Sequence, residues 1–195
     1  MNSIEPILNQ SIAELQAILP RLAELRPALQ QLGDMMVQCW QNRGKVLIAG
    51  NGGSAADAMH FAEELVVRFA ANRRALAAIA LTDPTVLTCA GNDFGYETVF
   101  SRQVEALGNA GDLLIVMSTS GNSPNLIKAL QVARQQGLRT AALLGKDGGK
   151  TRGLADVELI VPSNVTGRIQ ECHQLMFHSL CQWIDEVFAP DSAHS

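Results

Sequence analysis

Short apolar runs alternate with longer amphipathic segments over most of the chain. The apolar runs, each short enough for a buried strand, lie at 46–49, 76–80, 113–116, 140–144 and 157–161. The amphipathic segments, whose apolar residues recur every three or four positions, lie at about 54–70, 84–106, 124–136, 149–154 and 167–188. This alternation predicts a three-layer, doubly wound α/β fold, in which helices cover both faces of a sheet of five parallel strands.

The chain begins with a different pattern. Residues 4–43 have the apolar spacing of helices and no strand-like run. Pro20 and Pro27 interrupt the pattern, which predicts two helices that are joined or kinked there. This N-terminal helical arm has few neighbours of its own, so we expect it to pack on the rest of the chain and on a second subunit. Core packing within one chain is the alternative.

A hydroxyl-rich loop, residues 117–124, joins the third predicted strand to the next helix. Ser123 can cap that helix, and Pro124 suits its first turn, where no backbone N–H is needed. Serine and threonine hydroxyls then gather at the positive end of a helix dipole, where a phosphate can be held. The alternative is an ordinary polar turn that only caps the helix.

The first strand ends in a glycine turn, at 50–54, that leads into a helix with His60 and Glu64. The turn lacks the Walker ending and the spacing of a dinucleotide-binding loop. His60 and Glu64 lie four residues apart on one face of the helix, where they can share a divalent metal or form a common surface pair. Arg68 continues that face by one more turn.

Two further loops follow strands. The insertion at 91–96 contains the only tyrosine, and its Asp93 is a candidate either for binding sugar hydroxyls or for capping a helix. The glycine turn at 145–150 can be explained as a structural turn alone, with no role in binding.

The last helix carries two histidines and glutamines in an apolar setting. Spacing favours Gln174 as the partner of His178, because these residues are four apart. Gln170 is eight residues from His178, a rise of ~12 Å along a helix.

The composition is that of a globular protein: 195 residues, of which 47% are hydrophobic and 17% charged, with a formal net charge of −4. We expect one domain over 1–195, with the arm at 1–43 and the α/β core and last helix at 44–188. The net negative charge argues against a nucleic-acid partner.

Four cysteines without a C-x-x-C pair indicate reduced core thiols. The chain shows no basic leader with an apolar signal run, and no apolar run approaches the ~20 residues that span a bilayer. We therefore expect a cytoplasmic protein that does not enter the membrane.

Taken together, these stretches resemble the sugar isomerase (SIS) domain family over nearly the whole chain. The resemblance implies the flavodoxin-like SIS form of the α/β fold. The matching motifs are GNGGS at 50–54, DAMHFAEE at 57–64, GNDFGY at 91–96, STSGNS at 118–123, GKDGG at 145–149 and RIQE at 168–171. One departure is Gly167, where some members carry an acid.

The resemblance also implies a binding site and an assembly. One Zn²⁺ per subunit would be held by His60, Glu64, Gln170 and His178, although spacing alone favoured Gln174. The two views agree if the metal lies midway along the helix, or if subunits share the site. Family members are homotetramers with active sites between subunits. Substrate would be bound by Asn51, Gly52, Gly53, Ser54, Glu64, Arg68, Asn92, Asp93, Ser118, Thr119, Ser120, Ser123 and Gln170.

The activity that the resemblance implies is the isomerisation of D-sedoheptulose 7-phosphate to D-glycero-D-manno-heptose 7-phosphate. Glu64 would act as the base and His178 as the acid that serves the substrate oxygens. One alternative is a non-catalytic scaffold that resembles the replication initiator-associating protein, in which we expect the carboxylate at position 64 to be lost. Another is an SIS isomerase of a different phosphosugar.

Overall fold

A sheet of five parallel strands forms the middle layer of the protein, in the order β2-β1-β3-β4-β5. The strands are β1 (Val46–Gly50), β2 (Ala78–Ala80), β3 (Leu113–Ser118), β4 (Arg139–Gly145) and β5 (Val157–Val161). The prediction of five parallel strands is confirmed, and the order is the flavodoxin-like one, whose switch point lies between β1 and β3. The computed structural model describes residues 3–189, so residues 1–2 and 190–195, which belong to the expected domain, lie outside the described residues.

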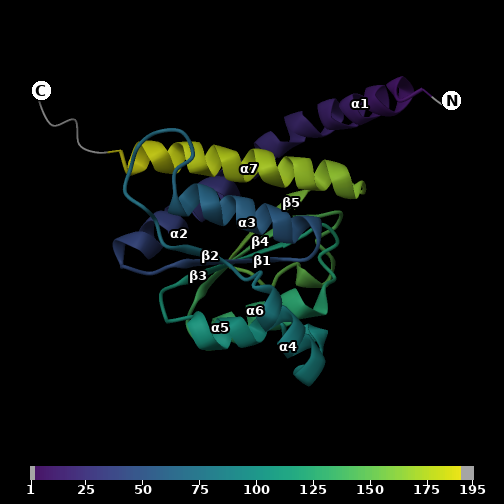
Figure 1. The fold of residues 1–195 in the computed structure, drawn as a ribbon. Helices are drawn as coiled ribbons and strands as arrows, with labels where there is room; N and C mark the ends of the chain where they lie inside the picture. Colours follow the sequence, from purple (N-terminus) through teal and green to yellow (C-terminus); the bar gives the residue numbers. More distant parts are fainter. Residues whose placement is uncertain (1–2, 190–195) are drawn as a thin grey trace, which may run out of the picture.

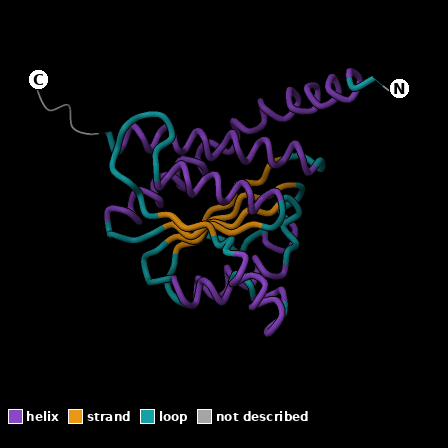
Figure 2. Tube along the Cα trace, viewed as in Figure 1, coloured by secondary structure: helices purple, strands orange, loops and turns teal. Residues whose placement is uncertain are grey.

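Helices cover both faces of the sheet, as Figures 1 and 2 show. One face is covered by α2 (Arg26–Gln41), α3 (Gly53–Val66) and α7 (Thr166–Val187), and the other by α4 (Pro84–Phe94), α5 (Ser101–Leu107) and α6 (Pro124–Gln135). Alternate residues of a strand point to opposite faces, so Ile48 joins the first core cluster and Leu47 the second. The three-layer prediction is therefore confirmed.

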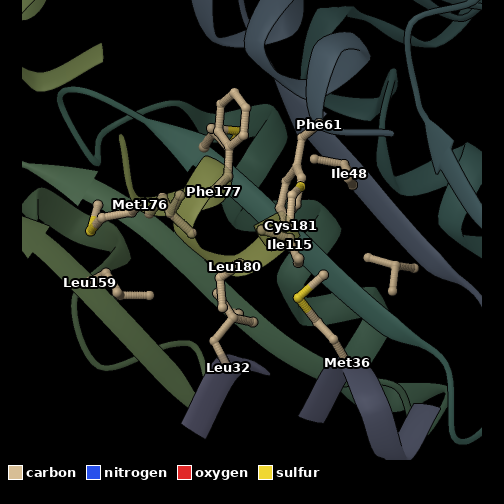
Figure 3. Close-up of a cluster of buried hydrophobic side chains, with 14 of the residues drawn as sticks. Leu32, Met36, Ile48, Phe61, Ile115, Leu159, Met176, Phe177, Leu180 and Cys181 are labelled. Carbon is tan, nitrogen blue, oxygen red and sulfur yellow. The ribbon is translucent and has the colours of Figure 1, made fainter. Parts of the chain in front are cut away.

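The larger core cluster lies between the sheet and the helices α2, α3 and α7 (Figure 3). Phe61 of α3 and Phe177 of α7 are fully buried, and their rings stack with centroids 5.0 Å apart. Leu32 and Met36 of α2 close the cluster on its other side. This packing holds α3 and α7 side by side, and both helices carry predicted site residues.

The N-terminal arm consists of α1 (Glu5–Leu22), a 3₁₀ turn at Ala23–Leu25, and α2. The predicted break occurs after Pro20, which lies within the last turn of α1, and Pro27 occupies the first turn of α2, where its missing N–H costs nothing. Helix α1 projects from the body (Figure 1) and exposes Ile7, Leu8, Ile12 and Leu19, and Ile4 just before it is also exposed.

Three helix predictions need correction. The segment 84–106 is two helices, because Gly95 adopts φ +89° after α4. The segment 149–154 contains only a 3₁₀ turn, Gly149–Thr151. The helix predicted to reach residue 70 ends at Val66. Among the cysteines, Cys39, Cys172 and Cys181 are buried free thiols as expected, whereas Cys89 is exposed.

The segment between α3 and β2, residues 67–77, is here called the strap. It rises over the C-terminal end of α7 before it returns to the sheet (Figure 1). Asp185 of α7 accepts hydrogen bonds from the N–H groups of Ala70 and Ala71, both at 2.8 Å. The guanidinium of Arg73 lies 2.8 Å from the other oxygen of Asp185, and both side chains are buried. Burial alone raises the pKa of Asp185, but the two N–H groups and Arg73 outweigh it and lower the pKa.

No helix among residues 3–189 combines the length and the apolar character needed to cross a bilayer.

The buried Arg73–Asp185 pair yields a first prediction. Asp185→Asn leaves the Arg73 charge buried without its partner, so the free energy of unfolding falls by about 3–5 kcal/mol in urea titrations at pH 7. Because the folded-state pKa of Asp185 is lowered, its contribution is present above the ordinary carboxylate pKa and is lost as the pH falls through the folded-state value. Asp34→Asn changes an exposed carboxylate in α2 and shifts stability by less than about 0.5 kcal/mol. Equal effects of the two substitutions would contradict the buried-pair account.

Candidate active site

The glycine turn and the hydroxyl-rich loop lie next to each other at the carboxyl ends of β1 and β3. These strands pair directly, with Gly50 opposite Met117, so the residues that follow them meet at the switch point of the sheet. Ligands of doubly wound sheets bind at this position. The sequence motifs at 50–54 and 118–123 therefore share one site.

Hydrogen bonds within the hydroxyl-rich loop shape its turn. The hydroxyl of Ser118 accepts from the N–H of Gly121 at 3.1 Å, and that of Ser120 accepts from Asn122 at 3.2 Å. Ser123 occupies the N-cap position of α6, with Pro124 in the first turn as predicted. The side chain of Ser123 makes no capping hydrogen bond, so this part of the prediction is wrong. Its hydroxyl, beside a helix N-terminus, is not committed to the helix.

The glycine turn at 145–150 supports this loop from behind. The backbone N–H and the hydroxyl of Thr151 both donate to the carbonyl of Gly121, at 2.9 and 2.8 Å. The backbones approach so closely that a Cβ on Gly121 would lie 1.9 Å from the carbonyl oxygen of Gly148. The turn therefore has a structural role, as its sequence indicated.

An amide pair fixes the glycine turn to α6. Asn51 and Asn125 exchange side-chain hydrogen bonds of 3.0 and 2.9 Å, and the hydroxyl of Tyr96 donates to Asn51 at 3.0 Å. The sequence analysis missed Asn125, whose partner lies 74 positions away. A cavity of about 470 Å³ opens beside this network, lined by Asn51, Tyr96, Glu97, Ser123, Pro124 and Asn125.

The remaining predicted substrate ligands differ in exposure. Ser54 is buried at the start of α3, whereas Gly52 and Gly53 are exposed and Gly52 has φ +57°. Thr119 is half-buried, and Arg68 is exposed on the strap. The other exposed pair, at the end of α4, is Asn92 and Asp93.

The helix-cap alternative for Asp93 is wrong. Asp93 lies within the last turn of α4, whereas the N-cap of that helix is Asp83, which accepts from the N–H groups of Thr85 and Val86. Asp93 instead accepts a hydrogen bond from the amide of Asn92 at 2.7 Å.

A three-residue cluster forms where α3 faces α7. His60 Nε2 lies 3.1 Å from Glu64 Oε1 on α3, and His178 comes from α7. One ligand atom of each residue lies within 4.8 Å of the other two. The surface-pair interpretation of His60 and Glu64 is incomplete, because a third side chain of a type that can bind metals joins them.

The surroundings of His178 disfavour the protonated form of its ring. Burial and the neighbouring His60 lower the pKa of His178, while the charges of Glu64 and Asp57 oppose this effect. Its Nε2 is buried and has no hydrogen-bond partner among residues 3–189. A buried nitrogen without a partner is costly unless a metal or donor satisfies it. Two imidazoles and one carboxylate are a common ligand set for Zn²⁺ with an open position, so the cluster fits this ion.

The two candidate glutamines of α7, Gln170 and Gln174, contact other parts of α3 than this cluster in the single chain. Gln174 donates to Asp57 at 2.8 Å, so its amide faces α3 one turn before His60. Gln170 lies against Gly53, where an added Cβ would be 2.3 Å from its Nε2. His60 is seven residues further along α3 than Gly53, a rise of ~10 Å. Gln170 is therefore at the glycine-turn end of α3, and both spacing arguments missed the contact between helices.

Asp57 is a second residue that the sequence analysis did not single out. It is 4% exposed, and the oxygen that does not bind Gln174 is buried without a partner in the described part of the chain. Only its place in the 57–64 motif pointed to it.

Comparisons with known proteins identify the family of the chain. The model of the SIS domain family matches residues 10–145. A phosphoheptose isomerase from Paramagnetospirillum magneticum is 54% identical over 94% of this chain and 96% of its own length, and one from Helicobacter pylori (strain P12) is 50% identical with the same coverage. The structure of a phosphoheptose isomerase from Neisseria gonorrhoeae is 43% identical, with a TM-score of 0.88 over 94% of this chain and 100% of the other. The resemblance to the SIS family is confirmed.

The close contact between the two loops yields a second prediction. Gly121→Ala forces a Cβ against the carbonyl of Gly148, whereas Gly111→Ala, also at positive φ (+91°), meets nothing within 4 Å. Both substitutions incur about 1–2 kcal/mol of left-handed strain, and Gly121→Ala loses about 1–3 kcal/mol more from the clash. Urea unfolding of the two variants measures the difference. Equal losses would mean that the contact does not constrain the loop.

Proposed function

The chain belongs to the SIS domain family and is an isomerase of its phosphoheptose isomerase branch, and we propose that its substrate is D-sedoheptulose 7-phosphate and its product D-glycero-D-manno-heptose 7-phosphate. This product would enter heptose synthesis for the lipopolysaccharide core, a cytoplasmic role. The observation that carries the proposal is the meeting of His60, Glu64 and His178 between α3 and α7. A scaffold of this fold needs no such cluster.

The reaction requires two kinds of proton transfer. A base removes a proton from C1 of the ketose, an enediol forms, and the proton returns to C2. A second group moves protons between O1 and O2. We assign the first role to Glu64, whose side chain is 15% exposed and therefore partly removed from water. His178 takes the second role while its ring nitrogen is free of the metal, because a neutral imidazole then offers one N–H and one lone pair to the substrate oxygens.

We propose one Zn²⁺ per subunit, with His60, Glu64 and His178 as ligands. The unpartnered Nε2 of His178 and the donor set support this choice. When bound, the ion would polarise the substrate carbonyl. Gln170 lies at the glycine turn in the single chain, so its part in the ligand set requires a side-chain movement or a second subunit.

The hydroxyl-rich loop would hold the phosphate. Ser118, Thr119, Ser120 and Ser123 offer hydroxyls beside the N-terminus of α6, where the helix dipole favours an anion. The sugar would contact Asn51, Gly52, Gly53 and Ser54 next to it, together with Gln170. Arg68, Asn92 and Asp93 are exposed in one chain, and we propose that they complete the substrate site in the assembled protein.

We propose that this assembly is a homotetramer in which the arm, residues 1–43, makes subunit contacts. Helix α1 buries only Ile18 within the chain, while the apolar side chains near its start remain exposed. The separation of the glycine turn from Glu64, eleven residues or ~16 Å along α3, also supports an active site formed by more than one subunit.

The role of Glu64 is tested by a matched pair of substitutions. Glu64→Gln keeps the size of the side chain but removes the base, so kcat for sedoheptulose 7-phosphate falls by about 10²–10⁴-fold. Glu63→Gln changes the exposed neighbour and leaves kcat near the wild-type value. Zinc content and circular dichroism are measured on the same samples. Near-normal turnover by a folded Glu64→Gln protein would refute the assignment.

The substrate is tested with a panel of ketose phosphates under zinc-loaded conditions. We expect kcat/KM for sedoheptulose 7-phosphate to exceed the values for fructose and arabinulose phosphates by at least tenfold, a difference of about 1.4 kcal/mol in transition-state binding. A preference for a shorter sugar would favour the alternative of another SIS isomerase. If the protein binds zinc but turns over no sugar phosphate, the proposed isomerase activity is refuted.

A further inference from the structure

The ring of His178 packs against Phe69, which belongs neither to α7 nor to the three-residue cluster. Phe69 of the strap lies with its ring centroid 5.3 Å from that of His178, and the two planes are tilted by 30°. On other sides, His178 meets the ring edges of Phe177 and His60, at 4.6 and 5.0 Å. Phe69 is half-buried and packs against the larger core cluster.

The strap is fastened directly beside Phe69. The next two residues, Ala70 and Ala71, donate their N–H groups to Asp185 of α7, seven residues beyond His178 on the same helix. The buried guanidinium of Arg73 binds the second oxygen of that carboxylate. The backbone of Phe69 is therefore held to the helix whose histidine its ring covers.

The Arg73–Asp185 pair, here called the strap anchor, also contacts α3, the other helix of the cluster. Arg73 donates to the carbonyl of Glu64 at 2.7 Å and to that of Leu65 at 2.9 Å, which satisfies two acceptors at the C-terminal end of α3. One buried arginine thus connects the end of α3, the strap and Asp185 of α7.

The orientation of a histidine ring is weakly determined by its own torsion. Rotation about χ2 of histidine is broad, so the packing around the ring must select the angle at which a nitrogen meets a ligand. For metal-binding histidines, groups outside the ligand set orient the ring and change metal affinity. The Nε2 of His178 has no hydrogen-bond partner in residues 3–189, so no such bond fixes the ring through that atom.

We propose that Phe69 is a positioning residue for His178: its ring, held by the strap anchor on Asp185, sets the angle at which the imidazole faces His60 and Glu64. This inference rests on the metal site of the proposed function. Simple core packing by Phe69 would affect stability alone, whereas positioning affects zinc affinity.

The experiment compares zinc affinity among full-length variants, by competition of the metal-free proteins with a chelator. Phe69→Leu keeps an apolar side chain of similar volume and preserves the fold, but we expect zinc to bind about 3–10-fold more weakly. Phe69→Ala weakens zinc binding by about tenfold or more. Phe69→Tyr, which retains the ring, binds zinc within about twofold of the wild type.

Phe188→Ala is the matched control. Phe188 is another half-buried phenylalanine packed on the same cluster. Its ring contacts Trp40, with centroids 5.9 Å apart, and the guanidinium of Arg74, which lies 4.8 Å from the ring centroid, but no aromatic contact joins it to Phe69 or His178 among residues 3–189. We expect this variant to lose thermal stability as Phe69→Ala does and to keep wild-type zinc affinity. Wild-type affinity in Phe69→Leu and Phe69→Ala, or an equal loss in Phe188→Ala, would overturn the positioning role alone. A wild-type chain that binds no zinc would refute the proposed metal site and this inference with it.

Discussion

The register of α3 against α7 is the constraint on which the candidate site depends. The two helices advance together: Gly53 meets Gln170, Asp57 meets Gln174 a turn later, and Phe61 stacks on Phe177 a turn after that. This order places His178 beside His60 and Glu64. A slip of one helical turn, ~5.4 Å, would separate the histidines and bury the wrong side chains in the core. The stacking of Phe61 on Phe177 therefore helps to set the register of α3 and α7, and that register brings the cluster residues together.

The two ends of α3 have different tasks. Its first turn adjoins the hydroxyl-rich loop, where neutral hydroxyls and a helix dipole suit a phosphate. Its last turns carry Glu64 and are closed by the buried guanidinium of Arg73. A single helix thus links the proposed binding end to the proposed reactive end, and the length of the helix keeps them apart within one chain.

Periodicity predicted most of the fold, because buried parallel strands and amphipathic helices have distinct patterns. It failed at Gly95, where one left-handed residue divides an otherwise continuous helical pattern, and at the strap, where helical spacing continues past Val66 although the chain leaves the helix. The first outcome depends on the backbone conformation of one glycine, and the second accompanies tertiary contacts of the strap with α7 that local spacing does not contain.

The sequence predicted the candidate site only in part, as it did the fold. Spacing within one helix identified His60 with Glu64, but it paired His178 with Gln174, whose amide faces Asp57 instead. Residues such as Asn125, Phe69 and Asp185 gave no local signal, since their partners lie far away in the chain. Motif resemblance supplied the residues that we propose as reactive, and only the fold revealed the side chains that pack around them.

The backbone contact between Gly121 and Gly148 has a consequence for recognition. Because each turn occupies the space into which the other would move, the loop has one fixed shape before the proposed phosphate binds. Little conformational entropy remains to be lost on binding, so the hydroxyls can contribute most of their interaction energy to affinity. A sugar without a phosphate would gain nothing from this preorganisation, and the protein would discriminate between the two at the first encounter.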